Sequence, residues 1–94
     1  MKIRVELVGR FRDIVGSAEI LVDMEEGSTV HDLLRKMADK HGEKFRERVF
    51  QTGSVRVSED VTIVLNGRVI PVDEAHSVSL SEASRVVLMP EAVI

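Results

Sequence analysis

Cysteine, tryptophan and tyrosine are absent from the sequence. Without cysteine, the chain can form no disulfide, thiolate nucleophile, iron–sulfur cluster or cysteine zinc site. The three phenylalanines do not alternate with basic residues, as the base-stacking platform of a nucleic-acid-binding protein requires. Because the formal net charge is −3, we also expect no nucleic-acid partner.

Long hydrophobic runs are absent as well. No apolar run approaches the roughly 20 residues of a membrane-spanning helix, so we expect no membrane partner. The N-terminus alternates charged and apolar residues from position 2, which indicates a strand rather than a signal peptide. We therefore predict one cytoplasmic domain, residues 1–94, with a single hydrophobic core.

The first quarter of the chain carries two strand patterns. Residues 2–8 alternate charged and apolar side chains. Residues 19–24 alternate again, with Ile20, Val22 and Met24 against Glu19, Leu21 and Asp23. Between them, residues 10–15 show helical spacing over one turn. We predict two antiparallel strands joined by a long loop.

The clearest element is a helix that begins after Thr29. Thr29 is the predicted N-cap, and Asp32 is placed to return the bond of a capping box. Gly42 is the predicted stop. The intervening apolar residues have the spacing of a helix buried on one side: Val30, Leu33, Leu34, Met37 and Ala38.

The second half of the chain reads as a short helix, a loop and a hairpin. Residues 43–50 predict the helix, and the loop that follows holds a weak strand at residues 55–57. Asn66-Gly67 is a strong hairpin signal between strands at residues 61–65 and 68–72. Pro71 marks the returning strand as an edge strand.

The last strand is the continuous apolar run of residues 86–89, which predicts a place at the centre of the sheet. Pro90 ends it, because proline lacks a donor N–H. The right-handed crossover preference places this strand beside the first one. We predict an α+β, ubiquitin-like β-grasp fold, a mixed sheet of four to five strands with one main helix packed across one face.

Four stretches carry a further pattern. Residues 7–16 read LVGRFRDIVG, with an arginine–acid–isoleucine–x–glycine segment, and residues 27–34 read GSTVHDLL at the helix start. Residues 64–68 read VLNGR in the hairpin, and residues 80–90 read LSEASRVVLMP through the last turn, strand and proline. In order and spacing, these stretches resemble the MoaD/ThiS family of small ubiquitin-like sulfur carriers, most closely the small subunit of molybdopterin synthase.

The resemblance implies a role in molybdopterin biosynthesis. Members end in Gly-Gly, and an E1-like enzyme adenylates the terminal carboxylate. Sulfur then replaces AMP, and the resulting thiocarboxylate enters a synthase active site. Glycines suit this task because residues without Cβ permit close backbone approach.

The chain departs from the family pattern after Pro90. Ile94 stands where the first family glycine falls, and a β-branched residue crowds its own carboxylate. The glycines are nowhere adjacent; they occupy positions 9, 16, 27, 42, 53 and 67. The tail is therefore open to three interpretations: a terminus without chemistry, an apolar plug for a partner's groove, or a carboxylate that is still activated.

The resemblance implies two partners, an E1-like adenylating enzyme or a protein like the large subunit of molybdopterin synthase. We predict contacts to either partner from two segments. Arg10, Phe11 and Arg12 provide a basic rim around an apolar spot, to which Lys2 and Arg4 would add. The tail provides Pro90, Ala92, Val93 and Ile94.

No catalytic residue, cofactor or metal site is predicted. His31 and His41 are ten residues apart on one helix and point about 80° apart, and His76 falls in a separate loop. We expect solvated or capping roles for them. Two functions stay open: an interaction module that docks on one of these partners without thiocarboxylate chemistry of its own, and a working sulfur carrier activated at its C-terminus.

Overall fold

The computed structural model of the protein describes residues 1–91. Five strands and four helical segments follow one another along the chain. They are β1 (Lys2–Leu7), α1 (Arg10–Val15), β2 (Glu19–Asp23), α2 (Val30–His41), α3 (Glu43–Val49), β3 (Val61–Leu65), β4 (Arg68–Ile70), the 3₁₀ helix η1 (Val72–Glu74) and β5 (Arg85–Pro90).

The five strands form one mixed sheet in the order β2-β1-β5-β3-β4. β1 and β5 are parallel, and the other three pairings are antiparallel. The last strand therefore lies at the centre beside the first, and β4 lies at an edge, as predicted. The α+β, ubiquitin-like β-grasp fold is confirmed.

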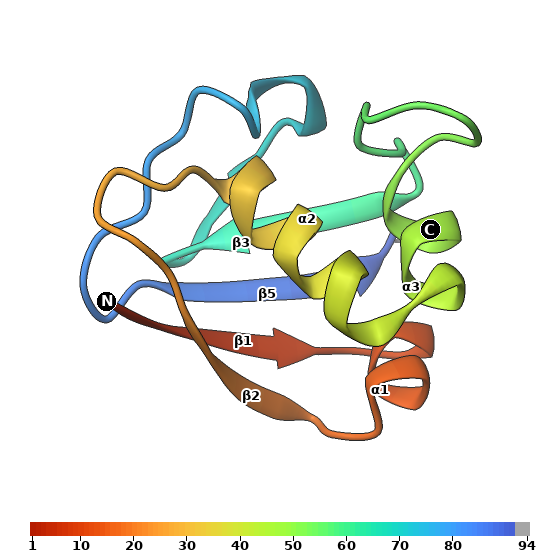
Figure 1. Cartoon of the computed structure of the whole chain (residues 1–94), viewed down its shortest axis with the longest axis horizontal. Coiled ribbons are helices and arrows are strands. Elements are labelled where there is room, and N and C mark those ends of the chain that lie inside the picture. The colour runs from red at the N-terminus through yellow and green to blue at the C-terminus, as the bar shows by residue number, and fades with distance from the viewer. Residues whose placement is uncertain (92–94) are drawn as a thin grey trace.

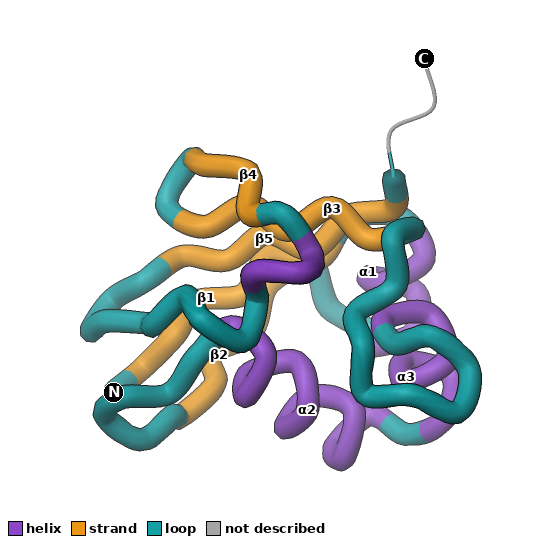
Figure 2. Tube along the Cα trace, turned by 90° about the horizontal axis from the view of Figure 1, so that it is seen from above, coloured by secondary structure: helices purple, strands orange, loops and turns teal. Residues whose placement is uncertain are grey.

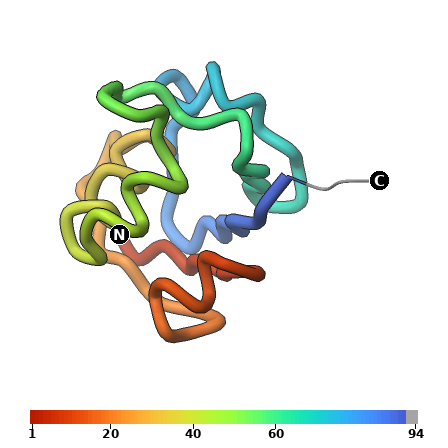
Figure 3. The backbone as a smooth tube through the Cα atoms, turned by 90° about the vertical axis from the view of Figure 1, so that its right-hand side faces the viewer, coloured from red at the N-terminus to blue at the C-terminus, as the bar shows by residue number. Residues whose placement is uncertain are grey.

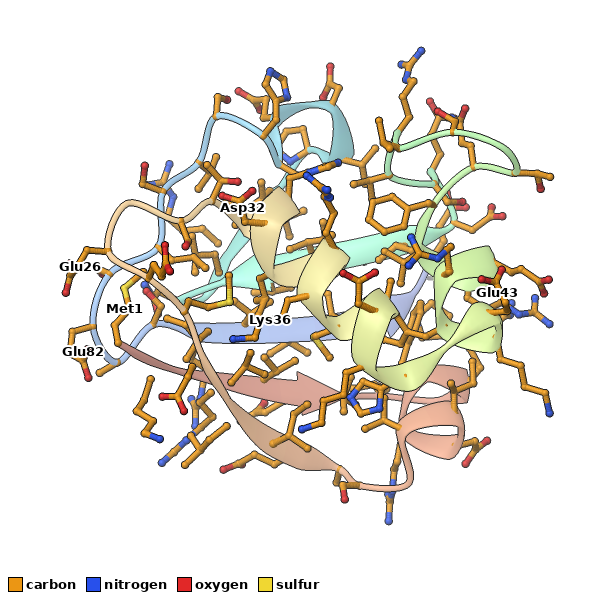
Figure 4. The ribbon with its side chains drawn as sticks, viewed as in Figure 1. Met1, Glu26, Asp32, Lys36, Glu43 and Glu82 are labelled. Carbon is orange, nitrogen blue, oxygen red and sulfur yellow. The ribbon has the colours of Figure 1, made fainter. Side chains whose placement is uncertain are left out.

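Helix α2 crosses one face of the sheet, while α1 and α3 lie at one end (Figure 1). Its start has the predicted capping box: Asp32 N–H donates to Thr29 Oγ1 at 3.2 Å, and Thr29 N–H donates to Asp32 Oδ2 at 2.9 Å. The Thr29 backbone bond lowers the pKa of the Asp32 carboxyl. Figure 4 shows Asp32 at this end of α2 and Lys36 one turn further on, where Lys36 Nζ donates to the Asp23 carbonyl.

The core lies between α2 and the sheet. Leu33, Leu34 and Met37 project from the helix onto Ile3 and Ile63, and all five side chains are buried. Complete burial of one such side chain is worth roughly 1.5–3 kcal/mol relative to exposure. The helix is held by this apolar stripe, because twelve residues alone are marginal in water.

The hairpin forms at Asn66-Gly67, where both residues have positive φ, 50° and 85°, as a type I′ turn requires. The returning strand β4 is shorter than predicted, because η1 begins at Val72, directly after Pro71. The predicted weak strand at residues 55–57 is wrong. That segment makes only an isolated bridge, from Val57 to Phe50.

Within residues 1–91, none of the helices has both the length and the apolar character needed to cross a bilayer.

Candidate functional site: the open sheet face and the end of β5

Within residues 1–91, the helices lie on one face of the sheet and leave the other face open (Figure 2). Side chains of a strand alternate between the two faces, so residues next to core residues point to the open face. In β5, Val86 and Leu88 are buried, whereas Val87 and Met89 are half-buried. The apolar run of the last strand therefore supplies the core with one half of its side chains and the open face with the other half.

A row of valines crosses the open face. Val69 of β4 pairs with Val64 of β3, and Val64 pairs with Val87 of β5. Val69 is 68% exposed, and Val64 and Val87 are half-buried. In the next row, Met89 pairs with Thr62. We call Thr62, Val64, Val69, Val87 and Met89 the apolar half-face. Contiguous apolar surface of this kind marks protein-interaction sites.

The other half of the open face, over β1 and β2, carries charged side chains around Leu21, which pairs with Arg4 and is 61% exposed. Lys2 Nζ lies 2.9 Å from Asp23 Oδ1, and Arg4 Nε lies 3.2 Å from Glu19 Oε1. The hydrogen bond from Lys2 lowers the pKa of the Asp23 carboxyl. These pairs are largely exposed, so solvent and salt screen them and they add little to stability. Their consequence is a polar border beside the apolar half-face.

The end of β5 lies on the side of α1 and α3, away from the N-terminus (Figure 1). Figure 3 shows it beside the turn that leads into β3. Glu91 N–H donates to the Asp60 carbonyl of that turn at 2.8 Å. Pro90 is opposite Val61 in the ladder and lies against Gly9, the residue before α1. Pro90 and Glu91, the last described residues, therefore lie next to Met89, at one end of the apolar half-face.

The predicted partner-contact residues near α1 differ in their exposure to solvent. Phe11 is 1% exposed, and its ring packs edge-on against Phe45 with the ring centroids 6.0 Å apart. The predicted apolar surface spot at Phe11 is therefore wrong, because α1 turns this side chain into the core. Arg10 and Arg12 are exposed, and their contact with a partner stays a prediction. The structure does not join them with Lys2 and Arg4, which are paired with β2.

Pro90 is the one predicted tail residue that the structure places. Ala92, Val93 and Ile94 lie outside the described residues, so their partner contacts also stay predictions.

Two histidines that are distant in sequence line one cleft. His31 at the start of α2 and His76 after η1 face it together with Arg56 and Asp73. His31 is held by Val55, whose carbonyl lies 2.7 Å from Nε2. No group of three or more potential metal ligands occurs within residues 1–91. His41 lies apart from this cleft, against Phe45.

The apolar half-face was not predicted from the sequence. The sequence predicts a buried, central strand for Val87 and Met89, because a continuous apolar run does not reveal that one sheet face is uncovered. The available signal was the single long helix, which is enough to cover only one face of a five-stranded sheet.

The family model described as the ThiS family matches residues 5–92. The putative molybdopterin converting factor subunit 1 from Pyrococcus furiosus is 31% identical, with a TM-score of 0.78 over 98% of this chain and 99% of that one. No curated protein matches the sequence.

Two more solved structures share the fold at lower identity. SAMP1 from Haloferax volcanii is 19% identical, with a TM-score of 0.82 over 100% of this chain and 99% of that one. A chain in the BexX/CysO complex of Amycolatopsis orientalis is 12% identical, with a TM-score of 0.70 over 98% of each chain.

Proposed function

The chain belongs to the ThiS family, and we propose that it acts as a docking module whose open sheet face binds an E1-like adenylating enzyme or a protein like the large subunit of molybdopterin synthase. The observation that carries this proposal is the apolar half-face, in which Val69 is 68% exposed. The Val69 side chain is not part of the hydrophobic core. A partner that covers the row gains the burial of several apolar side chains.

The charged border beside the apolar half-face supports a protein partner that covers this face, rather than a strand that pairs with the edge of the sheet. Exposed ion pairs around an apolar centre are the usual arrangement of a specific interface, with a polar rim that stays hydrated. The pairs Lys2–Asp23 and Arg4–Glu19 supply such a rim on one side. A protein partner is in keeping with one structural neighbour, since CysO of Amycolatopsis orientalis is found in a complex with BexX.

We further propose that this module acts in the cytoplasm. We also propose that it docks without forming a thiocarboxylate of its own. The support is chemical: no two glycines are adjacent in the 94 residues, and the family chemistry rests on a Gly-Gly end.

Two variants of similar exposure test the docking surface. Val69→Asp places a charge on the apolar half-face, and Val55→Asp places one in the loop after α3; the two valines are 68% and 69% exposed. Titration calorimetry against the E1-like enzyme and against the synthase large subunit should show at least about tenfold weaker binding for Val69→Asp, or roughly 1.4 kcal/mol. Val55→Asp should bind like the unaltered protein. Equal affinities for the two variants would refute the assignment of this face.

The second candidate function is that of a working sulfur carrier in molybdopterin biosynthesis. It is favoured by the 31% identity to the putative molybdopterin converting factor subunit from Pyrococcus furiosus. The two functions are separated by the intact mass of the protein after incubation with the E1-like enzyme, ATP and a sulfur donor. An unchanged mass supports docking alone. Exchange of a C-terminal oxygen for sulfur establishes the carrier, and Gly-Gly in place of Ile94 provides the positive control.

A further inference from the structure

Pro90 packs against a backbone position that only glycine suits. Gly9 has φ 63° and ψ −130°, a conformation that residues with a Cβ rarely adopt. A Cβ on Gly9 would lie 3.1 Å from Pro90 Cγ and 3.3 Å from Pro90 Cδ. Such contacts are tighter than ordinary packing, so a residue with a Cβ would require the proline ring to shift by a few tenths of an ångström.

The other five glycines make no comparable contact. Each also has positive φ, but a Cβ added at any of them would meet nothing within 4 Å. Gly42, with φ 88° and ψ −169°, is a turn glycine without a close neighbour. Gly9 therefore meets two requirements, the turn before α1 and the close approach of Pro90.

A second contact holds the chain on its other side. Glu91 N–H donates to the Asp60 carbonyl at 2.8 Å. Asp60 is fixed in turn, because its own N–H donates to Ser58 Oγ at 3.1 Å. Ser58 N–H donates to the carbonyl of Val49, at the end of α3, at 2.7 Å.

We propose that Gly9 and the turn of residues 58–60 are positioning elements for the C-terminal segment. Together they fix Pro90 and Glu91 between α1 and the start of β3, and so set the orientation of the chain at Glu91, beside the apolar half-face. This inference rests on the proposed docking function, because a direction matters only if a partner receives the segment. A chain that is already oriented loses less freedom on binding.

Hydrogen exchange at the Glu91 amide, measured by NMR in the full-length protein, tests the anchoring without any partner. Gly9→Ala should make this amide exchange about five- to tenfold faster, as expected for the loss of one hydrogen bond. Gly42→Ala strains a glycine backbone of similar kind and should leave Glu91 unchanged. Equal exchange at Glu91 in both variants and in the unaltered protein would overturn the proposal.

A second pair of variants avoids backbone strain. Ser58→Ala removes the hydroxyl that accepts the Asp60 N–H, whereas Ser54→Ala removes a hydroxyl that accepts the Arg56 N–H at 3.0 Å in the same loop. Only Ser58→Ala should speed Glu91 exchange. If Ser54→Ala speeds it equally, the loop as a whole, and not the turn at residues 58–60, holds the segment, and the proposal fails.

The positioning role is tested by affinity for the E1-like enzyme. Gly9→Ala should weaken binding by roughly tenfold, but it should cause no further loss in a protein that already carries Val93→Ser and Ile94→Ser. A loss of equal size in both backgrounds would show that Gly9 acts elsewhere than through the tail, which would overturn this role. If the unaltered protein binds no partner, the proposed function fails, whereas the exchange results still decide the anchoring.

Discussion

Replacing Phe11 by alanine should destabilise the domain by about 3–5 kcal/mol. The side chain is 1% exposed and packs edge-on against Phe45. Loss of the buried ring removes roughly 1.5–3 kcal/mol of transfer free energy, and the cavity it leaves adds the remainder. The edge-to-face pair with Phe45 accounts for about 0.5–1.5 kcal/mol within that total.

Urea denaturation measures this effect directly. The midpoint should fall while the slope m stays constant, because the surface exposed on unfolding hardly changes. A loss of about 3 kcal/mol corresponds to a decrease in Tm of roughly 12–24 °C in a domain of this size. Phe11→Leu keeps most of the volume and provides a milder variant if Phe11→Ala does not fold.

The exposed neighbours supply the control. Arg10→Ala and Arg12→Ala should each change the free energy of unfolding by no more than about 0.5 kcal/mol. If Phe11→Ala instead stays within about 1 kcal/mol of the unaltered protein and weakens partner binding, Phe11 is a surface contact after all, and the assignment to the core is refuted.

Two further predictions concern α2. Thr29→Ala should cost about 1 kcal/mol of unfolding free energy, because the N-cap bond to Asp32 is lost. Ser28→Ala, one residue earlier, should cost less than half of that in the same denaturation assay, and an equal cost would contradict the capping role. Burial, with a smaller contribution from Lys40, lowers the pKa of His41 below 6.5, so the unfolded chain takes up a proton first as the pH falls. The loss of stability caused by His41 should begin as the pH drops below about 6.5 and be complete below its folded-state pKa. His41→Leu should lack this decrease and His76→Gln should retain it, whereas an unchanged pH profile in His41→Leu would show that another group is responsible.

Local signals were sufficient for several elements. Thr29 and Asp32 satisfy each other's backbone donors within one helical turn, so four consecutive residues are enough to predict the start of α2. Asn66-Gly67 likewise suffices for the hairpin, because both residues tolerate positive φ. The family resemblance can also be recognised from the sequence, since it depends on the order and spacing of short sequence stretches along the chain.

Most elements and their order could be predicted from the sequence, because they follow from interactions between residues close in the chain. The place of β5 beside β1 joins the two ends of the chain, and it was predicted from the crossover preference and the family resemblance rather than from a local pattern. The tertiary structure alone decided which apolar residues stay exposed. Val87 and Leu88 are neighbours with similar side chains, yet one faces open solvent and the other the core, because only one face of the sheet is covered. It also turned Phe11 inward and brought Gly9 and Asp60 to either side of Pro90 and Glu91. Contacts between residues distant in sequence depend on how the elements pack together, and no local pattern contains that information.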